Sequence, residues 1–243
     1  MKQRYKLTIE FDGTQYSGWQ IQPNARTVEE EIENAFSRIL QQPVDIIGQG
    51  RTDAGVHAEK QIAHVNLASE IKIDDLLYAL RGVLPRDICI WKMEKVSSHF
   101  HARFDAKSRQ YRYQIVTRPR PLLRSFSFFE NNEIDIEVLK RCAEMSAGKH
   151  DFENFSKANK DQPDAVCTVL KSTVEQKGDL IIYRIRANRF VHHMVRRLVG
   201  TMLQAATERL DIKAFEELLN NPDTTRISTG ITGKGLILED VAY

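Results

Sequence analysis

One order of strand and helix patterns occurs twice along the chain, and this repetition constrains the fold more than any other feature. In the first half, apolar residues alternate with polar ones over residues 5–11, as is typical of a half-buried strand. The patterns that follow predict a helix over 28–40, strands at 44–47 and 61–67, a helix around 76–80 and a strand at 88–96. The predicted order is therefore strand, helix, strand, strand, helix, strand.

The second half repeats this order with one extra helix. It predicts a strand at 109–116, a helix from Asp135 to Gly148, a hairpin of 166–175 and 180–187, a helix over 190–208, a helix from Asp211 and a strand at 236–241. Two such units are related to the ferredoxin-like motif and to the fold that reads single-stranded RNA. We therefore expect an α+β protein with halves at 1–104 and 105–243. Their sheets are expected to join into one extended, mostly antiparallel sheet with helices on the outer faces.

Helix ends carry sequence signals in the first half. Thr27 followed by Glu30 predicts a capping box at the start of the first helix. Asp74 is the predicted N-cap of the second helix, and Gly82 is placed to end it.

Composition indicates an ordinary globular protein. The 243 residues are 42% apolar and 28% charged, and no stretch approaches the roughly 20 apolar residues of a membrane span. The chain begins directly with a strand pattern, so no signal peptide is expected. Cys89, Cys142 and Cys167 are odd in number and predict reduced core thiols in a cytoplasmic protein.

Basic residues are concentrated in two segments although the net charge is only +2. Asp105 is the single acid in a segment that carries Arg103, Lys107, Arg109, Arg112, Arg118, Arg120 and Arg124. The second segment carries Arg184, Arg186, Arg189, Arg196 and Arg197. Such clusters predict either a basic face for a polyanion such as nucleic acid or a merely solvated surface.

A glycine-rich loop, residues 48–57, lies between two predicted strands. Asp53 is its only carboxylate and is two residues from Arg51. A lone carboxylate beside a cation stays ionised, so Asp53 could act as a nucleophile or a base. The alternative is a surface turn in which Asp53 bonds its own backbone.

Several short motifs share an order and spacing with one known family. They are Phe11-Asp12-Gly13-Thr14, Tyr16-Ser17-Gly18-Trp19-Gln20, the loop from Gly50 to His57, Phe100-His101-Ala102-Arg103-Phe104, Tyr111-Arg112-Tyr113, His150-Asp151-Phe152, and Asn188-Arg189-Phe190 with His192-His193-Met194-Val195-Arg196. With these motifs the chain resembles the bacterial tRNA pseudouridine synthases of the TruA type, nearly from end to end.

The resemblance implies an isomerase, an intramolecular transferase, acting on tRNA. Uridine at positions 38 to 40 of the anticodon stem-loop would become pseudouridine by cleavage of the N-glycosidic bond, rotation of the bound base and attachment of its carbon five to the sugar. The resemblance also implies a homodimer and no cofactor or metal. His192 and His193 are expected to be adjacent on a helix, where they would point in different directions and form no paired ligand face.

The resemblance also implies roles for individual residues. Asp53 would be the nucleophile, attacking either the sugar or the base, and Arg51 would help to evict the target base and hold its place. Tyr111 would stack on the uracil or take part in proton removal, and Arg196 would pair with Asp53. Leu236 would press on the target uridine. The phosphate contacts are assigned to Arg118, Arg120 and Arg124.

Other interpretations remain open from the sequence. Tyr111 could be a core aromatic residue. His57 could support the loop through hydrogen bonds or be a second catalyst. Tyr16 and Trp19 could pack or could stack on RNA. Asp105 and the stretch 231–234 depart from the family pattern. The whole chain could also be a non-catalytic RNA-binding protein, or a hydrolase that uses Asp53 with His57, although the latter leaves the basic segments unexplained.

Overall fold

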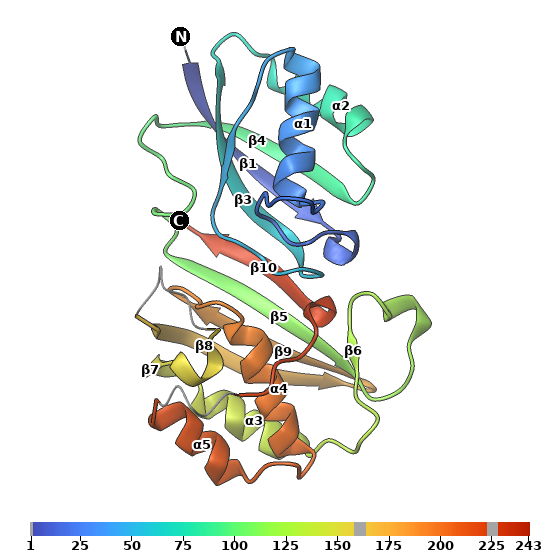
Figure 1. Ribbon diagram of the computed structural model, residues 1–243, viewed down its shortest axis with the longest axis vertical. Coiled ribbons are helices and arrows are strands. Elements are labelled where there is room, and N and C mark those ends of the chain that lie inside the picture. The colour runs from blue at the N-terminus through green and yellow to red at the C-terminus, as the bar shows by residue number, and fades with distance from the viewer. Residues whose placement is uncertain (1, 158–163, 223–227) are drawn as a thin grey trace. The chain divides into compact units, whose positions relative to one another are not determined.

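The computed structural model describes residues 2–157, 164–222 and 228–243. These residues form a mixed α+β fold with helices and a large, mostly antiparallel sheet (Figure 1), which confirms the predicted fold class. The chain divides into two compact units, Met1–Lys107 with Ile237–Tyr243, and Ser108–Leu236.

The first unit follows the predicted order of elements. They are β1 (Lys2–Phe11), α1 (Val28–Leu40), β2 (Ile46–Gly48), β3 (His57–Ala68), α2 (Ile73–Val83) and β4 (Ile88–Val96). Antiparallel pairing joins β4 to β1, β1 to β3 and β3 to β2. Tyr5, Leu7 and Ile9 alternate along β1 and are fully buried, as the strand pattern predicts. In Figure 1 the helices α1 and α2 of this unit lie side by side.

The capping box predicted at α1 does not form. Thr27 is the N-cap, but its side chain makes no capping hydrogen bond. The N–H groups of Val28 and Glu29 instead donate to the carbonyl oxygens of Gly18 and Trp19, at 3.2 and 3.0 Å. A preceding loop therefore satisfies the helix N-terminus, which a local motif cannot reveal.

The second unit contains the predicted elements in the predicted order, together with two short strands, at 128–129 and 148–151, that the sequence pattern does not predict. Its elements are β5 (Ser108–Val116), β6 (Phe128–Phe129), α3 (Ile136–Met145), β7 (Gly148–Asp151), β8 (Val166–Lys177), β9 (Leu180–Ala187), α4 (Met194–Ala206) and α5 (Ile212–Asn220). Antiparallel pairing joins β5 to β9, β9 to β8 and β8 to β7. The predicted hairpin is β8 and β9, with Gly178 at φ +62° in its turn. The predicted caps Asp135 and Asp211 both accept hydrogen bonds from the first turn of their helices.

Several predicted helix ends are wrong by a few residues. α4 begins at Met194 and not at residue 190, because His193 is its N-cap with a left-handed backbone at φ 66°. α2 begins after Lys72, before the predicted cap, and continues through Gly82. A cap motif alone therefore locates these ends poorly, since tertiary contacts decide the last turn.

The final strand, β10 (Leu236–Ala242), pairs in parallel with β3, with Ile237 opposite His57 and Leu238 opposite Ala58. From Ile237 onward it belongs to the first unit, whereas the predicted second half, 105–243, includes it. A strand pattern shows that a segment is extended and half-buried, but it does not show which strand it will pair with.

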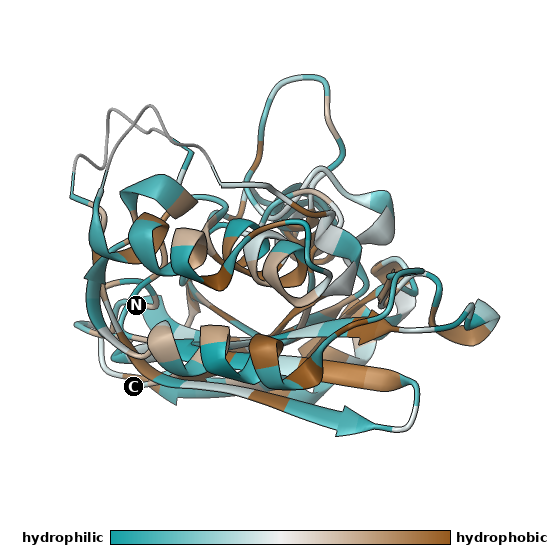
Figure 2. Cartoon of the chain, turned by 90° about the horizontal axis from the view of Figure 1, so that it is seen from below, coloured by the Kyte–Doolittle hydropathy of each residue, from teal (hydrophilic) through white to brown (hydrophobic). Residues whose placement is uncertain are grey.

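None of the described helices combines the length and the apolar character needed to cross a membrane, and the helices in Figure 2 mix apolar and polar residues. Cys142 and Cys167 are buried, and burial raises their pKa values to about 12 and about 11. Cys89 is exposed, so the prediction that all three thiols lie in the core is wrong for this residue. Its neighbours Ile88 and Ile90 on β4 are buried, which leaves Cys89 on the opposite side of the strand.

Candidate active site

Asp53 lies in the loop that connects β2 to β3 in the first unit. The N–H of Val56 donates to the carbonyl oxygen of Asp53 at 3.2 Å, which closes a tight turn. The N–H of Trp19 donates to the carbonyl oxygen of Thr52 at 3.2 Å. Asp53 is partly exposed and Arg51, in the same loop, is exposed. Both side chains are therefore accessible on a loop whose main chain is held on both sides of Asp53.

Two glycines of the N-terminal motifs press against this loop. A Cβ atom on Gly13 would lie 2.0 Å from the carbonyl oxygen of Val56. A Cβ atom on Gly18 would lie 2.4 Å from the carbonyl oxygen of Thr52, and the φ of Gly18 is +98°. Only glycine allows such close approach of two backbones. We name the segment 12–19 the loop brace, since it fixes the path of the chain around Asp53.

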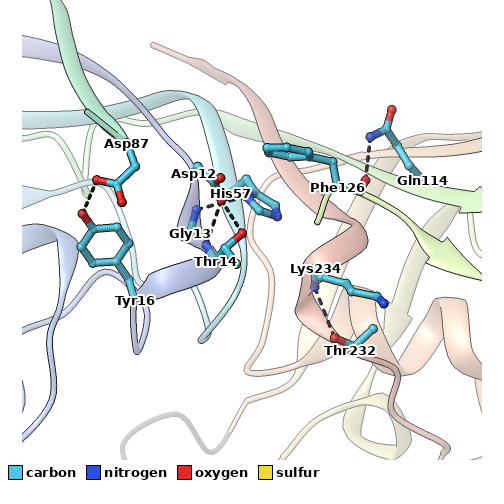
Figure 3. Close-up of polar contacts among 10 residues, drawn as sticks. All are labelled: Asp12, Gly13, Thr14, Tyr16, His57, Asp87, Gln114, Phe126, Thr232 and Lys234. Carbon is cyan, nitrogen blue, oxygen red and sulfur yellow. Dashed lines mark hydrogen bonds and ion pairs between the residues drawn. The ribbon is translucent and has the colours of Figure 1, made fainter. Parts of the chain in front are cut away.

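His57 connects the loop brace to β3. The residue is 2% exposed, and its Nδ1 accepts the N–H of Gly13 at 3.0 Å. Asp12 Oδ1 lies 3.0 Å from the same Nδ1 and accepts the N–H of Thr14 at 2.9 Å (Figure 3). This buried arrangement favours the bracing role of His57 over a catalytic one.

Trp19 and Tyr16 pack within the first unit and are almost completely buried. The indole Nε1 of Trp19 donates to Glu29 Oε1 at 3.0 Å, and burial raises the pKa of this carboxyl. The hydroxyl of Tyr16 donates to Asp87 Oδ1 at 2.5 Å (Figure 3). The packing alternative for these two aromatic residues is therefore the one observed.

In the second unit, Tyr111 lies on β5 and is 8% exposed. Its ring meets the ring of Phe190 edge to face, with the centroids 5.1 Å apart and an interplanar angle of 87°. Tyr113, two residues along the strand, is fully buried, and its hydroxyl donates to the carbonyl oxygen of Thr232 at 2.8 Å. Tyr111 thus packs against a half-buried aromatic ring, and only a small part of its surface is accessible.

Arg196 lies on α4 and is held by the segment that leads to β10. Its Nε donates to the carbonyl oxygen of Ile231 at 2.7 Å. One turn further along α4, a Cβ atom on Gly200 would lie 2.2 Å from the carbonyl oxygen of Thr229. Leu236, which follows this segment, is buried. Arg196 and Leu236 are thus linked through one segment, 229–235, which we name the clamp.

The clamp also explains one departure from the family pattern. The carbonyl oxygens of Ile231 and Thr232 accept hydrogen bonds from Arg196 and Tyr113. The Thr232 hydroxyl accepts the N–H of Lys234 at 3.4 Å, an interaction within the clamp (Figure 3). Different side chains over 231–234 are therefore compatible with the same anchoring.

The three predicted phosphate-binding arginines differ in their surroundings. The guanidinium groups of Arg118 and Arg120 both lie 3.0 Å from carboxylate oxygens of Asp179. A hydrogen bond from Arg120 lowers the pKa of Asp179. Arg124 is exposed, and its Nη1 donates to the carbonyl oxygen of Pro121 at 3.3 Å. Two of the three arginines are therefore already paired with an acid.

Sequence reasoning missed two features of the site. The rings of His192 and His193 lie 4.1 Å apart just before α4, so the expectation that they diverge on a helix is wrong. The close-approach glycines Gly13, Gly18 and Gly200 were also missed as positioning residues. The only available signal was that the first two lie in short motifs of the family pattern.

Comparisons with known proteins identify the family of the chain. The sequence model of the tRNA pseudouridine synthase family matches residues 7–105 and 142–243. A protein named tRNA pseudouridine synthase A from Chlorobaculum tepidum is 40% identical over 243 residues, covering 100% of this chain and 98% of the relative. Proteins of the same name from Parabacteroides distasonis and Porphyromonas gingivalis are 37% and 36% identical, covering 99% of this chain and 96% and 97% of the relatives. The chain therefore belongs to the tRNA pseudouridine synthase family.

Proposed function

We propose that this protein isomerises uridine to pseudouridine at positions 38 to 40 of the anticodon stem-loop of tRNA, with Asp53 as the nucleophile. The full-length similarity to proteins named tRNA pseudouridine synthase A supports the activity and the tRNA substrate. The observation that carries the role of Asp53 is the brace. The partly exposed carboxylate of Asp53 lies on a loop whose main chain is held by hydrogen bonds and by close contact with two glycines.

The reaction is an isomerisation in which no atom is lost from the nucleotide. A carboxylate oxygen of Asp53 attacks either the sugar C1′ or the base C6 and is later released. The bond from N1 to C1′ breaks, the base rotates, and the bond from C5 to C1′ forms. The proton on C5 leaves, and N1 gains one. These steps need a fixed nucleophile and a base removed from its stack, and they require no redox chemistry.

The remaining assignments are part of the same proposal. Arg51 holds the space left by the extruded base, Tyr111 stacks on the uracil, Leu236 presses on it, and Arg196 pairs with Asp53. Phosphate contacts come from Arg118, Arg120 and Arg124. A homodimer lets one subunit grip the tRNA body while the pocket of the other receives the uridine.

Replacement of Asp53 by Asn tests the proposal. We expect Asp53→Asn to bind tRNA with unchanged affinity and to form no pseudouridine, measured by carbodiimide mapping and by nucleoside mass spectrometry after cyanoethylation. Asp75→Asn, an exposed acid on α2, is the matched control and should modify tRNA normally. Normal modification by Asp53→Asn would rule out its assigned role. A wild-type protein that binds tRNA without modifying it would favour the non-catalytic RNA-binding alternative.

A further inference from the structure

The motif Phe100-His101-Ala102-Arg103-Phe104 has no part in the proposed chemistry, yet it forms a firmly held loop between β4 and β5. The N–H of Ala102 donates to Nδ1 of the buried His64 at 3.1 Å. The hydroxyl of Tyr243 donates to the carbonyl oxygen of Ala102 at 2.6 Å. Burial lowers the pKa of His64 to about 4, so its ring stays neutral and Nδ1 remains an acceptor at neutral pH. The N–H and the carbonyl oxygen of Ala102, the central residue, both make hydrogen bonds, so the loop is fixed at this point.

The tip of this loop is closed by hydrogen bonds between neighbours. The N–H of His101 donates to Asp105 Oδ2 at 2.8 Å, and the N–H of Asp105 donates back to the carbonyl oxygen of His101 at 3.1 Å. The His101 Nδ1 accepts the N–H groups of Arg103 and Phe104 at 3.2 and 3.4 Å. Asp105, which departs from the family pattern, is therefore a structural acceptor that closes the turn.

This rigid tip presents a large aromatic side chain to solvent. Phe104 is 74% exposed, although its own N–H and the two residues before it are held in place. Its ring lies against His101, with centroids 4.3 Å apart at 37°. The guanidinium carbon of Arg103 lies 5.7 Å from the centroid of the Phe104 ring. Exposed Lys107 follows, so two basic residues, Arg103 and Lys107, lie close to the ring in sequence, against the one carboxylate of Asp105.

We propose that Phe104, flanked by Arg103, is a stacking platform for an unpaired base of the RNA that this protein binds. An exposed aromatic face accepts any base, and an adjacent guanidinium pairs with the backbone phosphate. Because the loop is already ordered, little conformational entropy is lost when the base stacks. The inference rests on the proposed function for the identity of the RNA, but it assigns a binding role and no chemical step.

The test compares Phe104→Ala, Phe104→Leu and Phe104→Trp with Tyr78→Ala. Tyr78 is a matched control, since it is an exposed aromatic residue (79%) on α2 of the same unit. We expect Phe104→Ala and Phe104→Leu to weaken tRNA binding about tenfold, and Phe104→Trp and Tyr78→Ala to stay within about twofold of wild type. The single-turnover rate of pseudouridine formation should be unchanged for Tyr78→Ala, because Tyr78 belongs to neither the proposed active site nor the proposed platform.

Equal tRNA affinity of Phe104→Ala and Tyr78→Ala would overturn the inference. A change in the sedimentation mass of the free protein on replacing Phe104 would also overturn it, since the ring would then lie between two copies of the chain. Phe104→Leu keeps an apolar side chain and lacks the ring. It therefore tests whether the ring is needed for tRNA binding even if Phe104→Ala has a lower melting temperature than wild type. A wild-type protein that binds tRNA but forms no pseudouridine would count against the proposed function, while the binding comparison at Phe104 would stand.

Discussion

The guanidinium of Arg196 donates a hydrogen bond to a main-chain acceptor. Its Nε donates to the carbonyl oxygen of Ile231, which fixes the plane of the group. A planar fork held in this way can present its terminal nitrogens to a carboxylate, which a lysine ammonium cannot imitate. The neighbour Arg197 is also partly buried, and its burial together with the adjacent Arg196 charge lowers its pKa. The two arginines therefore allow a matched comparison at one turn of α4.

We expect Arg196→Lys to lower the single-turnover rate of pseudouridine formation on the order of 100-fold, because the positive charge remains but its orientation is lost. Arg197→Lys should change the rate by less than about threefold. Both variants should melt within a few degrees of wild type in a thermal scan. An Arg196→Lys protein with near wild-type turnover would show that orientation of this group is not needed.

At the scale of elements, the loop brace is built from backbone contact more than from side chains. A side chain on Gly13 or Gly18 would overlap the backbone of the Asp53 loop. Gly82, in α2, has no atom within 4 Å of the position where a Cβ would stand, apart from its chain neighbours and the backbone of its own helix. Replacement of glycine by alanine is therefore expected to destabilise the protein at Gly13 and Gly18 and to stabilise it at Gly82.

Gly13→Ala should lower the free energy of unfolding by about 2–4 kcal/mol, because the new methyl group forces the brace away from Val56. Gly82→Ala should raise it by up to about 1 kcal/mol through helix propensity. Urea denaturation of both variants provides the measurement. A Gly13→Ala protein as stable as wild type would mean that the loop relaxes freely, and the assignment of the brace would then fail.

The elements themselves follow from hydrophobic periodicity, and their ends do not. Alternation along β1 and β5 and helical spacing along α1 depend on residues close in sequence, so the sequence predicts them well. The start of α1 depends on carbonyl groups of Gly18 and Trp19, and the start of α4 on the left-handed backbone of His193. Such contacts are decided by tertiary packing. The same holds for Gly13, whose role becomes visible only beside Val56.

At the scale of the whole molecule, a count of basic residues overstates the charge available for RNA. The sequence contains two arginine-rich segments, but Arg184 lies 3.1 Å from Glu175 and Arg189 lies 3.5 Å from Asp164. Arg118 and Arg120 share the carboxylate of Asp179 on the turn between β8 and β9. The acids that neutralise these arginines are distant in sequence from most of them, so the sequence predicts the clusters but not their pairing.

The shared carboxylate makes a quantitative test of the predicted phosphate contacts. Asp179→Asn removes one negative charge from between two arginines, so tRNA should bind about fivefold more tightly at low salt, and the logarithm of affinity should fall more steeply with salt. Glu144→Gln, at an exposed site on α3, makes the same change in net charge. Filter binding across a salt series separates a local effect at the two arginines from a general effect of net charge, because a general effect would change the tRNA affinity of both variants equally. If Asp179→Asn instead weakened binding, the carboxylate would be positioning the arginines, and their pairing would be part of the RNA-binding surface.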